Sequence, residues 1–168
     1  MNITAGKFKG QKVVAPDETI TRPTLSKVRM AVFNTLQALI DFEGASFLDM
    51  FAGSGIMGLE AISRGFEHVV AIEKNNKVYN ILLNNYKSLK VKPNLLKGDS
   101  LKLIPNEYFD VIYIDPPYYA GVYEQALSVL PDCKIVILEH TTNVDFSGYE
   151  IIKHKKYGDK TLTYLKKD

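Results

Sequence analysis

The residue types best suited to chemistry form the segment Asp115, Pro116, Pro117 and Tyr118, directly after an apolar run at residues 111–114. A short run of β-branched and aromatic residues predicts a strand that is buried on both faces of a sheet. The strand must end at Asp115, because proline lacks an N–H donor and favours extended geometry in the residue before it. We therefore expect a carboxylate and an aromatic ring at the carboxyl end of a central strand, where open α/β sheets bind their ligands.

These four residues can hold a planar base that carries an exocyclic amine. The lone pair of such an amine is delocalised into the ring, so its nitrogen is a poor nucleophile. Hydrogen bonds from the amine to the Asp115 carboxylate and the Pro116 carbonyl would favour a tetrahedral nitrogen during attack on an electrophile. Stacking on Tyr118 would hold the base, at about 1–3 kcal/mol per base–aromatic contact. An ordinary Asp-Pro-Pro turn explains the same residues equally well. A base-binding function is therefore favoured only if a second motif supports it.

The second motif is a glycine-rich turn, G-x-G-x-x-G, formed by Gly53, Gly55 and Gly58. It follows a predicted strand and opens a predicted helix, which is the context that this motif requires. Glu73 comes twenty positions after Gly53, at the end of the next predicted strand, where it can accept hydrogen bonds from ribose hydroxyls. The combination predicts a nucleoside-binding site, but it does not separate a dinucleotide from S-adenosylmethionine.

Charge favours S-adenosylmethionine over a dinucleotide. Asp49, just ahead of the glycine turn, can hold the positively charged amino-acid end of S-adenosylmethionine, whereas it would repel a pyrophosphate. Asp99 and Ser100 follow the third predicted strand, where a carboxylate can accept a hydrogen bond from an adenine amine. Asp99 fits equally well as the N-cap of a helix. We also expect Phe51 among the cofactor contacts. No metal site is expected, because one Cys and three scattered His lack a zinc-site spacing.

The elements that must position these residues alternate along the chain from Ser46. Strands are predicted at 47–51, 68–72, 94–97, 110–114 and 134–138, and helices at 56–63, 77–89, near 101 and at 122–130. This winding predicts an α/β, Rossmann-like fold with a mostly parallel sheet. Two further strands, at 149–156 and 161–165, flank the turn signal Tyr157-Gly158-Asp159-Lys160 and would add an antiparallel strand.

Ahead of this domain lies a basic segment. Residues 2–15 alternate polar and apolar around Gly6 and Gly10, which predicts a short hairpin, and Thr24 is the predicted N-cap of the following helix. Residues 1–30 carry six cations and two anions, a net charge of +4, although the whole chain is only +2. A basic arm indicates a polyanionic partner, most simply nucleic acid, and a solvated surface hairpin remains the alternative.

The residues expected to contact RNA are Lys7, Lys9, Arg22, Lys27 and Arg29. The chain, with 168 residues and 46% hydrophobic content, is long enough for one globular body with a substantial core. Its apolar runs are too short to span a bilayer, and the amino terminus lacks the apolar region of a secretory signal. We therefore expect a cytoplasmic protein without membrane contact, and a monomer.

Four segments together resemble the S-adenosylmethionine-dependent methyltransferases. Within them, the chain resembles the RsmD family of bacterial small-subunit ribosomal RNA guanine-N2 methyltransferases. The segments are I-T-A-G-K-F-K-G-Q-K-V, T-R-P-T-L-S-K-V-R-M-A-V-F-N, L-D-M-F-A-G-S-G-I-M-G-L-E-A-I-S-R-G and I-D-P-P-Y. The two amino-terminal segments separate this family from other enzymes with D-P-P-Y. One departure is Met30, where relatives commonly carry Glu.

The resemblance implies a class I methyltransferase fold, with a seven-stranded, mostly parallel sheet and an antiparallel last strand. It implies that Asp115 to Tyr118 hold the target guanine and that Gly53, Gly55, Glu73 and Asp99 hold the cofactor. Residues 1–42 would form a basic extension that contacts small-subunit ribosomal RNA, and residues 43–168 the methyltransferase domain.

The expected reaction is therefore direct methyl transfer from S-adenosylmethionine to N2 of a guanine in 16S ribosomal RNA. Three alternatives stay open at this point. The same chemistry can act on adenine N6 in DNA or another RNA. A nicotinamide-dependent oxidoreductase is disfavoured by Asp49. An RNA-binding module with a vestigial pocket is disfavoured by the intact Asp-Pro-Pro-Tyr segment.

Overall fold

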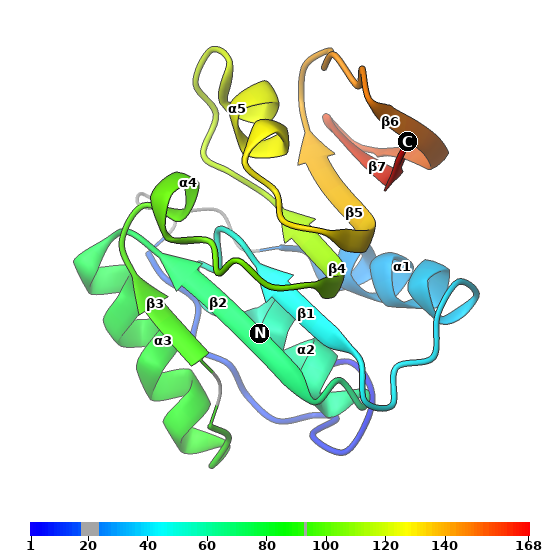
Figure 1. The fold of residues 1–168 in the computed structure, drawn as a ribbon. Coiled ribbons are helices and arrows are strands. Elements are labelled where there is room, and N and C mark those ends of the chain that lie inside the picture. Colours follow the sequence, from blue (N-terminus) through cyan, green and yellow to red (C-terminus); the bar gives the residue numbers. More distant parts are fainter. Residues whose placement is uncertain (18–23, 93) are drawn as a thin grey trace.

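A seven-stranded sheet forms the centre of the molecule (Figure 1), in a computed structural model that describes residues 1–17, 24–92 and 94–168. Its strands are β1 (Ser46–Asp49), β2 (His68–Glu73), β3 (Asn94–Lys97), β4 (Phe109–Ile114), β5 (Cys133–His140), β6 (Tyr149–Tyr157) and β7 (Lys160–Lys167). The strand order is β3-β2-β1-β4-β5-β7-β6, and only β7 runs against its neighbours on both sides. The predicted α/β sheet with an antiparallel last strand is confirmed.

The central strand β4 is buried on both faces, as its apolar run predicts. Val111 and Tyr113 belong to the hydrophobic core on one side of the sheet, and Ile112 and Ile114 to the core on the other side. β4 pairs in parallel with β1 and β5, so its end lies between theirs. Asp115 therefore leaves the sheet in the middle of its carboxyl edge.

Helices cover both faces of the sheet. They are α1 (Ser26–Gln37), α2 (Ile56–Ser63), α3 (Asn76–Ser88), α4 (Ser100–Leu103) and α5 (Val122–Ser128). Buried residues of α1, α2 and α3 share the first core, for example Phe33, Met57 and Leu82, and buried residues of α5 share the second. This layering explains why β2, β4 and β5 contain continuous apolar runs. None of the helices in the described part of the chain is both long enough and apolar enough to span a lipid bilayer.

The glycine turn sets how closely α2 approaches α3. Gly55 is the N-cap of α2 and has a φ of +86°, a conformation that other residues rarely adopt. A Cβ at Gly55 would lie 2.4 Å from Leu82 Cδ1, and one at Gly58 would lie 2.3 Å from the Tyr86 hydroxyl. The close packing of α2 against α3 therefore favours glycine at both positions. The predicted bounds of this helix, 56–63, are confirmed.

The amino-terminal segment folds back on itself, as the predicted short hairpin does. Asn2 and Lys12 form an antiparallel bridge, the Ile3 N–H donates to the Gln11 carbonyl at 3.0 Å, and the Val13 N–H donates to the Met1 carbonyl at 2.8 Å. The segment also packs along α2, where the Lys7 N–H donates to the Ser63 carbonyl at 2.9 Å. A Cβ at Gly6 would lie only 1.9 Å from that carbonyl oxygen, so the close approach requires glycine. Ile3, which pairs with residues 10 and 11 across this hairpin, is buried in the first core.

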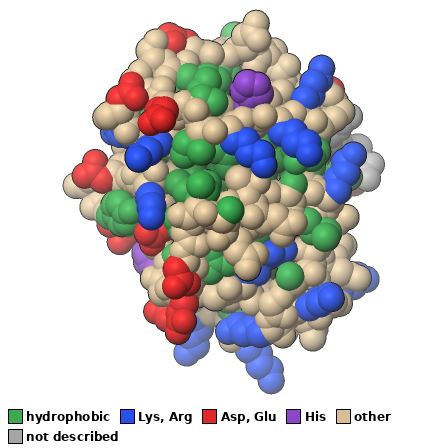
Figure 2. Space-filling view, turned by 90° about the vertical axis from the view of Figure 1, so that its right-hand side faces the viewer, with side chains coloured by type: hydrophobic (Ala, Val, Ile, Leu, Met, Phe, Trp, Pro, Cys, Tyr) green, Lys and Arg blue, Asp and Glu red, His purple; other side chains and the backbone are tan. Residues whose placement is uncertain are grey.

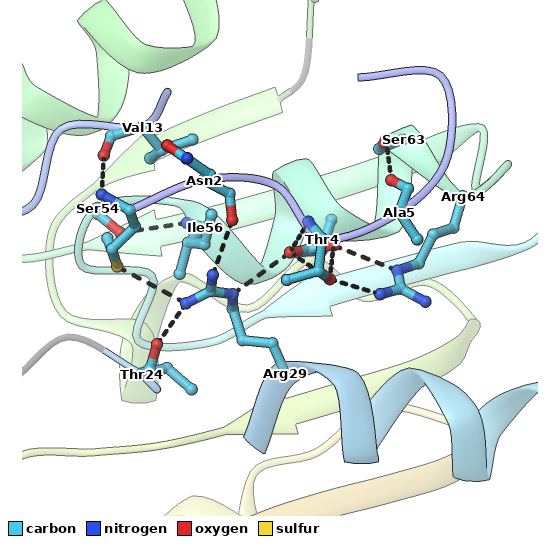
Figure 3. A network of polar contacts seen from close by, with 12 residues as sticks. Asn2, Thr4, Ala5, Val13, Thr24, Arg29, Ser54, Ile56, Ser63 and Arg64 are labelled. Carbon is cyan, nitrogen blue, oxygen red and sulfur yellow. Dashed lines mark hydrogen bonds and ion pairs between the residues drawn. The ribbon is translucent and has the colours of Figure 1, made fainter. Parts of the chain in front are cut away.

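A buried carboxylate, Glu60, joins this segment to α1 and α2. It accepts hydrogen bonds from the Thr4 N–H at 2.8 Å, from Arg29 Nε at 3.3 Å and from Arg64 Nε at 3.2 Å. Figure 3 shows Arg29 extending from α1 into this network, where it also donates to the Asn2 carbonyl at 2.8 Å. Arg29 is only 2% exposed. The prediction that Arg29 contacts phosphate is therefore wrong, because its guanidinium is paired inside the protein.

The start of α1 also differs from its prediction. Leu25, and not Thr24, is the N-cap of this helix, and its side chain makes no capping hydrogen bond. The Thr24 carbonyl instead accepts a hydrogen bond from the Arg29 guanidinium. The predicted cap fails because the buried arginine fixes the backbone here. Arg22, another predicted RNA contact, lies outside the described residues.

Candidate functional site

A cleft of about 940 Å³ opens at the carboxyl edge of the sheet. The residues that line it come from the segments after β1, β2, β3, β4 and β5 and from the start of β7. Of the predicted site residues, it is lined by Phe51, Gly53, Glu73, Asp99, Ser100, Asp115, Pro116, Pro117 and Tyr118. The two motifs predicted to bind different ligands thus share one cavity.

Glu73 connects the glycine turn to the end of β2. Its Oε1 accepts a hydrogen bond from the Gly53 N–H at 3.0 Å, and its Oε2 accepts one from the Asn75 N–H at 2.8 Å. Nothing lies within 4 Å of where a Cβ of Gly53 would be, so this part of the turn is open. The Glu73 carboxylate still has lone pairs that can accept hydrogen bonds from ribose hydroxyls.

Asp49 and Gly55, two predicted cofactor contacts, are not among the residues that line the cleft. Gly55 serves the packing of α2 described above. Asp49 is 1% exposed, and its Oδ2 has no hydrogen-bond partner among the described residues. Burial and the nearby Asp115 carboxylate raise the pKa of Asp49 to about 8, with a smaller contribution from Glu73, against an opposing backbone hydrogen bond from Gly58. A cation bound nearby would favour its charged form.

Asp99 and Ser100 lie at the start of α4. Asp99 Oδ1 accepts a hydrogen bond from the Leu101 N–H at 3.0 Å, so its interpretation as a helix N-cap is confirmed. Asp99 also lines the cleft, which leaves the predicted adenine contact as a proposal. Ser100 lines the cleft too, and its buried Oγ has no partner among the described residues. Unpaired buried oxygens at Ser100 and Asp49 fit a site that is completed by a polar, cationic ligand.

Asp115 is part of an ion-pair cluster that the sequence does not reveal. Lys160 Nζ lies 3.3 Å from Asp115 Oδ1 and 3.0 Å from Glu139 Oε1. The Tyr113 hydroxyl donates to Glu139 Oε2. Burial and the neighbouring Glu139 carboxylate raise the pKa of Asp115 to about 7, although Lys160 opposes the shift. The Lys160 ammonium thus offsets part of the effect that burial and Glu139 have on the Asp115 carboxyl.

The two missed members of this cluster differ in how well a pattern could find them. Glu139 follows the apolar run of β5, at a strand end like that of Asp115, so the same rule would have found it. Lys160 is the first residue of β7, directly after the turn at Gly158 and Asp159, and its contact with Asp115 spans 45 residues. No local pattern marks such a contact.

The aromatic residues after Asp115 are available for stacking. Tyr118 is 59% exposed, and its ring centre lies 5.9 Å from that of Tyr123. The Tyr123 hydroxyl accepts a hydrogen bond from the Thr141 N–H at 3.1 Å, which fixes this second ring. Tyr118, Tyr119 and Tyr123 all line the cleft, so a planar ligand there has aromatic partners.

The predicted RNA-contacting lysines do not form one patch. Lys7 and Lys9 are exposed, and Lys7 lines a separate cavity of about 520 Å³ with residues 62–67, which precede β2. This cavity lies at the amino edge of the parallel strands, whereas Asp115 lies at their carboxyl edge. Lys27 is exposed in the first turn of α1.

A second basic segment, which is not among the predicted RNA contacts, is the hairpin of β6 and β7. Residues 149–168 hold six lysines and three acidic residues, a net charge of +3. Lys153 and Lys155 are exposed on β6, and Lys153 Nζ donates to Thr35 Oγ1 of α1 at 3.1 Å. Figure 2 shows several Lys and Arg side chains on this side of the molecule. We call the surface formed by Lys27, Lys153 and Lys155 the α1–β6 basic face.

Comparison with known proteins gives matches over the whole chain. The family model described as conserved hypothetical protein 95 matches residues 1–166. Ribosomal RNA small subunit methyltransferase D of Escherichia coli (strain K12) is 34% identical over 138 residues, which cover 79% of this chain and 67% of that protein.

Two solved structures share the fold. The Escherichia coli protein yhhF matches with a TM-score of 0.87 at 23% identity, over 100% of this chain and 98% of that one. The 16S rRNA N2 G1207 methyltransferase RsmC of T. thermophilus, in complex with AdoMet and guanosine, matches with a TM-score of 0.66 at 16% identity. This match covers 88% of this chain and 45% of the RsmC chain. The fold is that of class I methyltransferases.

Proposed function

The chain belongs to the family described as conserved hypothetical protein 95, and we propose that it is an S-adenosylmethionine-dependent methyltransferase. Its proposed substrate is a guanine of small-subunit (16S) ribosomal RNA, methylated on the exocyclic N2. The observation that carries the proposal is that Asp115 to Tyr118 line the same cleft as Gly53 and Glu73. The relation to ribosomal RNA small subunit methyltransferase D supports the choice of substrate.

The cofactor side of the cleft is proposed to hold S-adenosylmethionine. When bound, this cofactor supplies an electrophilic methyl group on a sulfonium. Glu73 would accept hydrogen bonds from the ribose hydroxyls beside the open turn at Gly53. Ser100 Oγ and Asp99 would contact the adenosine. Asp49, which is buried and does not line the cleft, would stabilise the cationic amino-acid end through its charge.

The base side of the cleft is proposed to hold the guanine. Asp115 and the Pro116 carbonyl accept the two hydrogens of N2, which directs the nitrogen lone pair away from them, and Tyr118 stacks on the ring. N2 held in this way would attack the methyl carbon as the bond from that carbon to sulfur breaks, so that S-adenosylhomocysteine leaves and N2 loses one proton. Asp115, with a pKa of about 7, can hold that proton. Holding both reactants in register supplies much of the rate.

Because the cleft accepts a base and not a duplex, the target guanine must be unstacked or flipped out of its helix. The rest of the RNA then has to contact the outer surface. We assign this contact to the α1–β6 basic face and to the amino-terminal extension, residues 1–42. Lys7 and Lys9, with Lys7 at the opposite edge of the sheet from Asp115, would contact RNA farther from the target guanine. Phosphate attraction supplies affinity there without sequence preference.

Transfer of tritium from labelled S-adenosylmethionine to immature small ribosomal subunits tests the proposed function. We expect the wild-type chain to transfer label, and Asp115→Ala to lower the rate by about 100-fold or more, as loss of an oriented polar group at a reacting centre does. Asp132→Ala, an exposed residue before β5, is the matched control and should keep wild-type activity. Unimpaired transfer by Asp115→Ala, or no transfer by the wild type, would contradict the proposal.

A further inference from the structure

The turn between β6 and β7 brings one lysine to the carboxyl edge of the sheet. Tyr157 pairs with Lys160 at the end of the hairpin, and Thr161 pairs with His140 at the end of β5. Because β7 runs antiparallel to β5, the first residue of β7 lies where the parallel strands end. Lys160 therefore projects from the opposite direction into the region that holds Asp115.

At that position, Lys160 is shared by two carboxylates. Its Nζ lies 3.3 Å from Asp115 Oδ1 and 3.0 Å from Glu139 Oε1. The exposed fractions of the three side chains are 27% for Lys160, 18% for Asp115 and 3% for Glu139. All three residues line the cleft. The cluster is thus largely shielded from water but open to a ligand.

We propose that Lys160 is a positioning residue for methyl transfer, which holds Asp115 as an ionised carboxylate turned toward the target base. The inference rests on the proposed function. A charge-assisted hydrogen bond fixes Oδ1 of Asp115, which leaves Oδ2 to accept the amine hydrogen. Without the ammonium, two neighbouring carboxylates in a shielded site would compete to bind a proton. A protonated Asp115 would donate a hydrogen bond and could no longer receive the proton that N2 releases.

The charges around Asp115 predict opposite effects of two substitutions. The titratable groups that face it are Asp49 on β1, Tyr113 on β4, Glu139 on β5 and Lys160 on β7. Removing the cation with Lys160→Met raises the pKa of Asp115, and removing the competing anion with Glu139→Gln lowers it. A residue with a purely structural role would not give this pair of opposite shifts.

The test is the pH dependence of kcat/KM for methyl transfer, measured for the wild type and for four variants. We expect Lys160→Met to move the acid limb to higher pH by about one unit or more, so that activity lost at neutral pH returns in alkaline buffer. Glu139→Gln should move the limb to lower pH. Lys160→Arg, which keeps the charge, should restore most of the wild-type profile. Lys156→Met, on the exposed part of the same hairpin, should leave it unchanged.

A second measurement separates this inference from the proposed function. NMR titration of the Asp115 carboxyl carbon in the protein alone follows its pKa without any RNA. An upward shift in Lys160→Met and a downward shift in Glu139→Gln support the positioning role even if ribosomal RNA is not the substrate. An unchanged Asp115 titration in folded Lys160→Met, or a loss of activity that alkaline buffer does not reverse, overturns it.

Discussion

The N–H of Gly53 donates a hydrogen bond of 3.0 Å to Oε1 of Glu73, and so joins the turn after β1 to the end of β2. The other oxygen of this carboxylate accepts from the Asn75 N–H. Two backbone donors therefore orient the Glu73 carboxylate at the cleft before a ligand arrives. A ligand with vicinal hydroxyls meets an acceptor that is already in place, which lowers the entropic cost of binding.

Replacing Glu73 with Ala should weaken binding of S-adenosylhomocysteine by roughly 10- to 100-fold, because hydrogen bonds to charged groups contribute about 1.5–3 kcal/mol. Isothermal titration calorimetry measures this change. Glu67→Ala, an exposed residue before β2, should bind like the wild type. Equal affinity of the Glu73→Ala variant, or tight binding of NAD by the wild type, would argue against the assigned cofactor side.

Binding of the cofactor should release a proton from Asp49. With a pKa of about 8, this carboxyl is mostly protonated at pH 7 in the free protein. A cationic amino-acid end nearby stabilises the charged form and lowers the pKa, so binding at pH 7 should release up to about one proton. Calorimetry in buffers of different ionisation enthalpy counts that proton. Asp49→Asn should abolish the release, and a wild-type binding enthalpy that is independent of the buffer would contradict the assignment.

The α1–β6 basic face should govern the salt dependence of RNA binding. Neutralising Lys153 and Lys155 to Gln removes two phosphate contacts, so the slope of log affinity against log salt should fall by about 1–2. Filter binding to small-subunit ribosomal RNA measures the slope. The matched double variant of Lys87 and Lys134, which are exposed elsewhere, should keep the wild-type slope. If both double variants lose the same affinity, the contact is not localised to this face.

The sequence predicts the sheet well because its signals are local. The bounds of α2 follow from the glycine turn and those of β3 from a short apolar run, and both agree with the structure. The predictions that are wrong or missing concern residues whose partners lie far away in the sequence. Arg29 looks like a surface cation until Glu60, 31 residues away, is known to be its partner. Lys160 and Asp115, 45 residues apart, meet only because β7 reverses direction beside β5.

The Glu60 network should contribute strongly to stability. Glu60→Ala leaves the buried Arg29 guanidinium without its counter-charge, and breaking a buried ion pair in this way costs about 3–5 kcal/mol. Urea denaturation followed by circular dichroism gives the free energy of unfolding. Glu150→Ala, an exposed position on β6, should change it by less than about 0.5 kcal/mol. A loss below about 1 kcal/mol in Glu60→Ala would mean that Arg29 finds another partner.

The most direct test of the account is to identify the nucleoside that the protein methylates. Small subunits that lack the modification are incubated with the protein and S-adenosylmethionine, and the ribosomal RNA is digested and analysed by mass spectrometry. We predict the appearance of N2-methylguanosine with the wild type and its absence with Asp115→Ala. Appearance of N6-methyladenosine instead, or of no methylated nucleoside, would contradict a guanine held by Asp115 against the methyl group of the cofactor.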